Sequence, residues 1–197
     1  MTDSQLVREI KDGNVELYAE LMRRYERRIL GFIYQMLRSA GLEALAEDLT
    51  QETLYKAFRS LGSFRETDAS FATWLYAIAR NTVLSELRKQ KVAQLPLEHA
   101  VHAAASAAGP EVDMLRRERA ALVREAISRL PEKQRTALIL REYDQLDYQE
   151  IARILNQTVA SVKSLLFRAR MSVREQLAVY FSERTDQPLE MERMNPS

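Results

Sequence analysis

The residues best suited to chemistry lie between Lys163 and Arg174, a stretch with four basic side chains and no acidic one. If this stretch is a helix, the apolar residues at positions 162, 165, 166, 169 and 173 share an inward face. The residues left on the outward face are Lys163, Ser164, Phe167, Arg168 and Arg170. Lys and Arg suit phosphates and guanine edges, Ser can bond base edges, and a Phe edge can contact a thymine methyl. The pattern favours DNA binding, with a helical hairpin that carries a solvated basic face as the alternative.

The residues before this helix predict a short partner helix and a tight turn. Asp147 and Glu150 have the spacing of a capping box, which marks a helix start. The apolar stripe predicted for that helix contains Tyr148, Ile151, Ala152 and Leu155. The polar sequence NQTVA then predicts a turn, with Ser161 as the cap of the next helix. Together these elements form a helix-turn-helix, and Arg141, near the end of the preceding helix, could reach the DNA backbone or a base.

A second stretch with aromatic, basic and amide side chains runs from Ser70 to Val83 and contains the only tryptophan of the chain. On a helical projection, the face predicted to pack inward contains Phe71, Trp74, Leu75, Ile78 and Thr82. Thr73, Tyr76 and Arg80 fall on the opposite face, and Asn81 flanks them. We therefore expect Trp74 mainly to anchor the helix, and the polar face to contact a partner.

No set of residues predicts a reaction or a resident cofactor. The glycines are scattered, so no phosphate-cradling loop is expected, and the chain has no cysteine for a disulfide, a thiolate nucleophile or a Cys-based zinc site. His99 and His102 have the spacing of a metal pair, but no further ligands lie near them in sequence. Glu47 and Asp48 fit surface charge better than a catalytic dyad. We expect no cofactor, no metal and no enzymatic activity.

The elements that carry these residues are predicted to be helices throughout. The 197 residues are 46% hydrophobic and 29% charged, with only five Gly and five Pro and a net charge of +1. Helices are expected over residues 3–12, 14–38, 42–60 and 71–90, and again within 114–182. The predicted fold class is all-α, with two small helical domains at 1–91 and 114–182, joined by a flexible linker at 92–113. Residues 183–197 are predicted to form a polar tail.

Two blocks of sequence, in this order, resemble a known protein family. The block LPEKQRTALILREYDQLDYQEIARILNQTVASVKSLLFRAR resembles region 4 of bacterial extracytoplasmic-function (ECF) sigma factors of the sigma-70 family, which binds the promoter −35 element. The block DLTQETLYKAFRSLGSFRETDASFATWLYAIARNTVLSELRK resembles their region 2, which binds core RNA polymerase and opens the −10 element. The resemblance implies an ECF-type sigma factor, which directs promoter-specific transcription initiation and leaves catalysis to the polymerase.

The resemblance also assigns roles to residues. Positions that bind core polymerase would be Asp48, Gln51 and Glu52. Positions for the −10 DNA would be Arg65, Asp68, Ser70, Tyr76, Arg80 and Asn81, where the loop from Phe64 to Ser70 usually holds a flipped base. Positions for the −35 DNA would be Arg141, Lys163, Ser164, Phe167 and Arg168. The sequence departs from the family at Leu165, where relatives carry a basic residue or Ser, and at Leu75, the second of two aromatics in housekeeping sigma factors.

The partners implied are core RNA polymerase, through its β′ clamp helices and β flap, promoter DNA and an anti-sigma factor. No membrane insertion is expected, because no apolar run approaches the roughly 20 residues that cross a bilayer, and a cytoplasmic location follows. Two alternatives stay open at this point. One is a helix-turn-helix regulator whose N-terminal helices dimerise or sense a ligand, and the other is an enzyme in the N-terminal helices.

Overall fold

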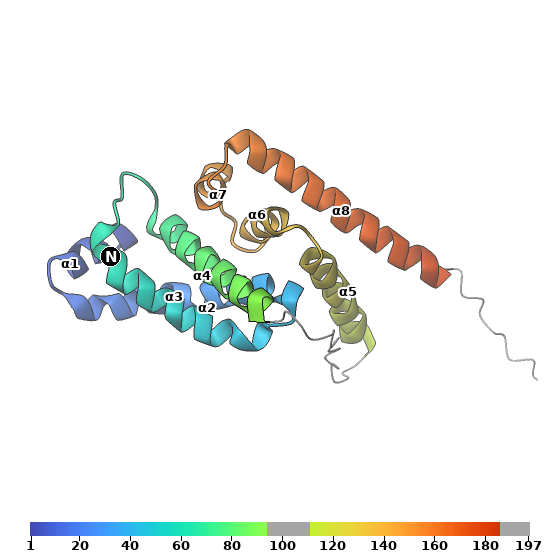
Figure 1. Ribbon diagram of the computed structural model, residues 1–197, viewed down its shortest axis with the longest axis horizontal. Coiled ribbons are helices and arrows are strands. Elements are labelled where there is room, and N and C mark those ends of the chain that lie inside the picture. The colour runs from blue at the N-terminus through green and yellow to red at the C-terminus, as the bar shows by residue number, and fades with distance from the viewer. Residues whose placement is uncertain (94–110, 186–197) are drawn as a thin grey trace, which may run out of the picture.

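The computed structural model describes the backbone of residues 1–93 and 111–185, and the side chains of 1–91 and 117–180. Every regular element in these ranges is a helix, which confirms the predicted all-α class (Figure 1). The N-terminal half contains α1 (Asp3–Lys11), η1 (Val15–Leu17), α2 (Tyr18–Leu37), η2 (Arg38–Ala40), η3 (Glu43–Leu45), α3 (Ala46–Ser60), η4 (Leu61–Ser63) and α4 (Phe71–Ala93). The C-terminal half contains α5 (Glu111–Ser128), α6 (Glu132–Glu142), α7 (Tyr148–Leu155) and α8 (Val159–Thr185).

The N-terminal half is built on α2, α3 and α4, which pack against one another around an apolar core. The core side chains of α2 recur at helical spacing and include Leu21, Ile29, Phe32, Ile33 and Met36. On α3, Leu49, Thr53 and Ala57 are buried in this core. This packing leaves the opposite side of α3 in solvent, where the predicted polymerase-binding residues lie.

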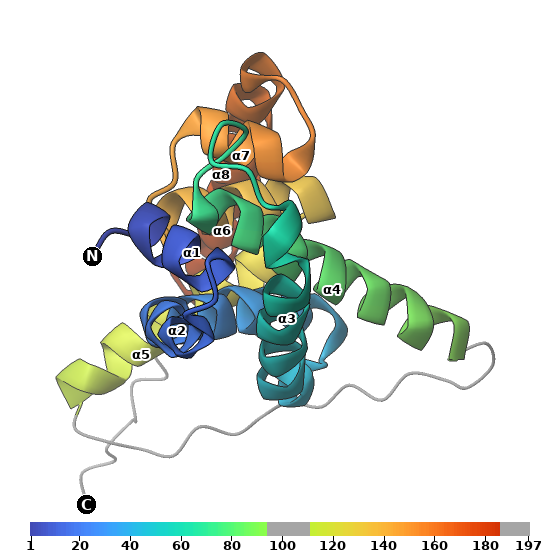
Figure 2. The same cartoon turned by 90° about the vertical axis from the view of Figure 1, so that its left-hand side faces the viewer.

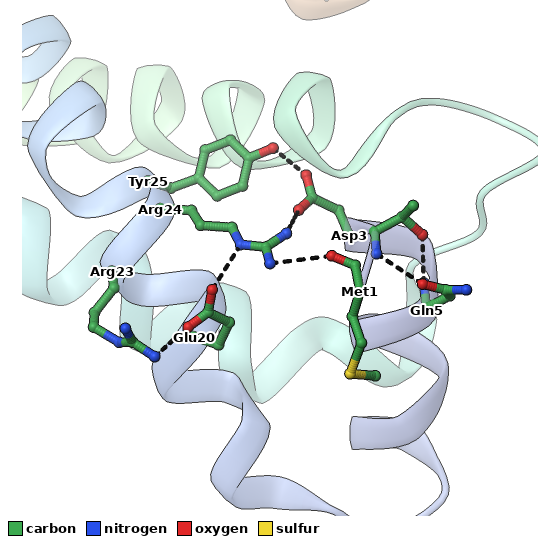
Figure 3. A network of polar contacts seen from close by, with 8 residues as sticks. Met1, Asp3, Gln5, Glu20, Arg23, Arg24 and Tyr25 are labelled. Atoms are coloured by element: carbon green, nitrogen blue, oxygen red, sulfur yellow. Dashed lines mark hydrogen bonds and ion pairs between the residues drawn. The ribbon is translucent and has the colours of Figure 1, made fainter.

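A polar network fixes α1 to the start of α2 (Figure 3). Asp3 accepts hydrogen bonds from Arg24 Nη1 at 2.8 Å and from the Tyr25 hydroxyl. Arg24 also donates to Glu20 at 3.0 Å and to the backbone oxygen of Met1 at 3.1 Å. A capping box between Thr2 and Gln5 starts α1. These bonds hold α1 against the edge of the helical core, beside the loop from Phe64 to Ser70.

The C-terminal half contains the helix pair that the sequence predicted. The capping box of Asp147 and Glu150 is present at the start of α7. Asn156 adopts a left-handed conformation with φ of 51° and ends α7, and α8 begins three residues later. The Thr158 hydroxyl accepts the backbone N–H of Ser161 at 3.1 Å, so Thr158 caps α8 and the prediction of Ser161 as its cap is wrong.

The two halves pack on each other through α4 against α7 and through α2 against α6 (Figures 1 and 2). Most of the predicted linker, with its two histidines, lies outside the described residues, as does most of the predicted tail. Helix α4 ends at Ala93, three residues later than predicted, and α5 begins at Glu111, three residues earlier than predicted. Both helices therefore extend into the predicted linker. None of the described helices has the length and apolar character needed to cross a membrane.

Candidate nucleic-acid interface

The outer face of α8 carries the side chains predicted to read DNA. Lys163, Ser164, Phe167 and Arg168 are all exposed, and Phe167 is 67% exposed. Behind them Val162, Leu166 and Ala169 are fully buried against α6 and α7. A large aromatic side chain held in water between cations has no packing role in this half. The helix-turn-helix therefore presents a basic and aromatic surface that suits a DNA groove.

Arg141 and Arg170 are engaged in contacts within the C-terminal half. Arg141 donates to the backbone oxygen of Leu146 at 2.9 Å and lies 5.0 Å above the Tyr148 ring, so it secures the connection between α6 and α7. Arg170 binds Glu142 at 2.7 Å. Guanidinium groups held in this way can orient the α7–α8 pair, and the contact of Arg141 with DNA stays a prediction.

The buried face of α4 is turned by roughly a quarter of a turn from the predicted one. Tyr76 is fully buried, with its ring edge-on to Phe32 at 5.4 Å. Arg80 has a side chain only 13% exposed and forms an ion pair with Glu132. The prediction that Tyr76 and Arg80 face outward is therefore wrong. The physical reason is that α4 is covered on two sides, by its own core and by the C-terminal half.

The face of α4 that does reach solvent borders a groove on α3. Trp74 is half-buried and packs against Phe64 and Phe71, which agrees with its predicted anchoring role. Asn81 is exposed, as expected, and lies in a groove of about 420 Å³ between α3 and α4. The groove is lined by Tyr55, Lys56, Arg59, Ser60, Ile78, Asn81, Thr82 and Ser85. The sequence did not predict Lys56 and Arg59 as part of this surface, because the predicted −10 residues all lie in the loop and on α4. Their positions beside the buried Ala57 on α3 could have indicated that they are exposed.

The loop between η4 and α4 is held at both ends and exposed between them. Lys11 Nζ donates to the backbone oxygen of Phe64 at 2.5 Å, which ties the loop to α1. Arg65 and Asp68, two of the predicted −10 residues, are exposed. Ser70, at the far end, hydrogen-bonds Thr73 at 2.8 Å. Between the loop and α1 lies a cavity of about 230 Å³, with aromatic walls and polar groups.

The predicted polymerase-binding residues lie together on α3. Asp48 and Gln51 are exposed, and Gln51 donates to Glu26 at 3.3 Å. Glu52, one turn beyond Asp48, binds Lys56 at 2.6 Å. Beside this patch, Val15, Phe58 and other residues of η1, α2 and α3 form an apolar groove of about 390 Å³. A polar patch beside an apolar groove is suited to a protein partner.

A second apolar groove, of about 570 Å³, lies in the C-terminal half. Its lining includes Val123, Ile127, Leu138, Val173 and Leu177, from α5, α6 and α8. Arg170 and Arg174 of α8 also line it, whereas the exposed residues Lys163, Ser164, Phe167 and Arg168 do not. The C-terminal half thus offers two different surfaces, one basic with an exposed aromatic ring and one apolar.

The described residues contain no group of three or more metal-ligating side chains. The strongest pKa changes belong to structural tyrosines: burial raises the pKa of Tyr18 to about 12, and its hydroxyl donates to the Leu54 backbone oxygen at 2.6 Å. A phenol of this kind stays protonated at neutral pH and acts as a hydrogen-bond donor within the core. The chemistry that the described surfaces support is recognition, through charge, stacking and apolar contact.

The chain is similar to known proteins over most of its length. Residues 21–92 match the family Sigma-70 region 2, and residues 120–173 match Sigma-70, region 4. The RNA polymerase sigma-H factor of Pseudomonas aeruginosa is 38% identical over 89% of this chain and 93% of its own length. The ECF RNA polymerase sigma-E factor of Escherichia coli is 35% identical over 88% of this chain and 93% of its own length.

A solved structure shows the same fold. The sigma factor RpoE, in complex with the anti-sigma factor NepR from Bartonella quintana, superposes with a TM-score of 0.62. The sequences are 24% identical, and the match covers 82% of this chain and 97% of that chain.

Proposed function

The chain belongs to the ECF sigma factors of the sigma-70 family, which direct RNA polymerase to promoters, and we propose which of its surfaces perform each step. The observation that carries the proposal is the exposed face of Lys163, Ser164, Phe167 and Arg168 on a helix whose other side is buried. This face enters the major groove of the −35 element. Phosphate contacts from the cations fix the register, and Ser164 and Phe167 contact base edges.

The α3 surface binds core polymerase. Asp48, Gln51 and Glu52 offer acceptors to cations of the β′ clamp helices, and the adjoining groove at Phe58 receives apolar side chains. The apolar groove around Leu138 and Leu177 suits the β flap, because a helix with an apolar face could fill it. Two protein contacts and two DNA contacts would tether the factor at several points, which raises the effective concentration at each.

The −10 element is contacted by the loop and by the groove between α3 and α4. Arg65 is free to reach a phosphate, and Asp68 can accept a hydrogen bond from a base amine. Lys56 and Arg59 add positive charge beside Asn81, which can read a base edge. Unstacking a base costs a few kcal/mol, and contacts in a pocket such as the loop cavity can offset that cost. Tyr76 is not included in this surface, because it is fully buried.

Transcription with purified core enzyme tests the proposal. The chain should direct run-off transcripts from a subset of a promoter library, and the selected sequences would report both elements. Arg168→Ala should weaken −35 selection and keep polymerase binding, whereas Asp48→Asn should weaken polymerase binding and leave the α8 surface intact. A gel shift without core enzyme provides the comparison with a conventional regulator. Tight operator binding by the free chain, with no promoter-specific transcription, would overturn the proposal.

The chain carries out no catalysis itself, because RNA synthesis belongs to the polymerase. It works in the cytoplasm, where the polymerase and the promoter are located. An anti-sigma factor binds it, as NepR binds the RpoE of Bartonella quintana, and covers surfaces needed for polymerase binding.

A further inference from the structure

The interface between the two halves brings three carboxylates of the C-terminal half onto donors of the N-terminal half. The first is Glu132, at the start of α6. It accepts hydrogen bonds from Arg80 Nε at 2.9 Å and Arg80 Nη2 at 3.0 Å. This geometry is bidentate, and the Arg80 side chain is only 13% exposed. The ion pair between Arg80 and Glu132 is therefore stronger than an ordinary surface ion pair.

The second carboxylate is Asp144, in the turn after α6. It accepts a hydrogen bond from the Tyr76 hydroxyl, and Arg28 Nε lies 3.6 Å from the same oxygen. Arg28 also donates to the backbone oxygen of Asp144 at 3.1 Å. The Asp144 side chain is 8% exposed, and burial raises its pKa. An ionised carboxylate at this position therefore carries a desolvation cost, which keeps the contact between the halves reversible.

The third carboxylate is Glu150, in the first turn of α7. Its Oε1 accepts from Ser70 Oγ and Thr73 Oγ1, each at 3.2 Å, while Oε2 keeps the capping-box bond to the Asp147 N–H at 3.0 Å. One side chain thus starts α7 and binds the end of the exposed loop. Helix α4, which follows the loop, packs against α7.

We propose that Glu132, Asp144 and Glu150 form an intramolecular clasp that holds the free chain closed and withholds Ser70 and Arg80 from single-stranded DNA. Glu150 and Glu132 occupy donors of Ser70 and Arg80 that a phosphate or a base acceptor would otherwise use, and Asp144 adds a further contact between the halves. The masking rests on the proposed function and on the predicted −10 contacts of Ser70 and Arg80, whereas the closure rests on the contacts alone. Opening the clasp frees the two halves to bind the −10 and −35 elements, which are separate segments of DNA.

The closure is tested by the distance between the halves in the free chain. Because the chain has no cysteine, the double variant Asp12→Cys/Glu175→Cys has only these two thiols, and each half then carries one dye. Arg80→Gln and Glu132→Gln should each lower the closed-to-open ratio by about tenfold. The charge-swapped pair, Arg80→Glu with Glu132→Arg, should restore it in part. The matched control is Arg27→Gln, which removes an exposed charge from α2 next to Arg28.

A second measurement separates closure from masking. A labelled single strand with the −10 sequence should bind the free Glu132→Gln/Glu150→Gln chain several times more tightly than the original chain. Run-off transcription at saturating core polymerase should stay unchanged, since neither residue belongs to the proposed binding surfaces. Unchanged energy transfer in every folded variant, checked by circular dichroism, would overturn the clasp. Opening without tighter DNA binding would overturn the masking of Ser70 and Arg80, while run-off transcription reports on the proposed function separately.

Discussion

Two aromatic residues illustrate how single side chains divide between recognition and folding in this molecule. Phe167 lies in solvent on α8 with cations beside it, and Tyr76 lies at the contact between the halves with its hydroxyl on Asp144. Both are aromatic residues on helices, but only Phe167 lacks a packing contact that would explain an aromatic side chain at its position. The exposed ring can contribute to binding at little cost to stability, whereas removal of the buried ring would leave a cavity.

Phe167→Ala should therefore weaken promoter binding and leave the fold unchanged. We expect a loss of about 1–2 kcal/mol in −35 affinity, in the range of one base contact, and a change in free energy of unfolding within about 0.5 kcal/mol. Holoenzyme titrations on promoters with each −35 base pair replaced would measure it. Met171→Ala, one turn further along α8, is the control. An equal loss on every sequence would show that Phe167 does not contact a base.

Trp74→Ala should lower stability before it affects specificity. The indole packs against Phe64 and Phe71 at centroid distances of 5.1 and 5.8 Å, and it is only half-buried. Full removal of a buried aromatic costs about 3–5 kcal/mol, so we expect about 2 kcal/mol here. Denaturant unfolding would measure the loss, with the exposed Tyr55→Ala as control. A stable Trp74→Ala chain that fails to open promoters would instead place the indole in the DNA-binding surface.

At the scale of the helix, the sequence predicted the buried face correctly where residues close in sequence determine it. The predicted stripe on α7 and the inward and outward faces of α8 follow from spacing, although α7 also packs on α4 and buries Ile154 outside that stripe. The face of α4 did not, because this helix is covered on a second side by residues far away in sequence. Helical spacing with a single core predicts that Thr73, Tyr76 and Arg80 face outward. In the structure these side chains contact α7, the turn after α6 and the start of α6, respectively.

The start of α8 offers a test at this scale. Thr158→Ala removes the side chain that accepts the Ser161 N–H, and we expect a loss of about 1 kcal/mol in the free energy of unfolding. Ser161→Ala removes only a bond to Gln157 at 3.0 Å and should cost about 0.5 kcal/mol or less. Unfolding of the two variants under the same conditions would show the order. The reverse order would mean that Ser161 is the cap after all.

At the scale of the whole molecule, the two sequence blocks predicted two helical units but not how they meet. Nothing in the spacing of Asp144 or Glu150 indicates partners on α2, on α4 or in the loop before α4, since the sequence separations of these contacts range from 68 to 116. Glu150 engages the hydroxyl of Ser70, and Glu132 engages the guanidinium of Arg80. The −10 surface therefore depends on the arrangement of the halves, and local sequence patterns describe it only in part.

This arrangement should respond to pH through Asp144. Burial raises the pKa of this carboxyl, so the closed form binds a proton more tightly than the open form, where water solvates the group. The contribution of Asp144 to closure is then largest at low pH and is lost as pH rises through the raised pKa. In Asp144→Asn the same site cannot titrate, while the amide oxygen can still accept from Tyr76.

The comparison of the two chains isolates this one carboxyl, because all other titrating groups are shared. Arg28 and Tyr76 face Asp144 from α2 and α4 and are retained in both. As pH rises from about 4 toward neutral, the closed fraction of the original chain should fall relative to that of Asp144→Asn. Energy transfer between dyes on the two halves, read over this range, would measure the difference. Parallel pH profiles would show that Asp144 keeps its ordinary pKa and that its burial does not make the closed form pH-dependent.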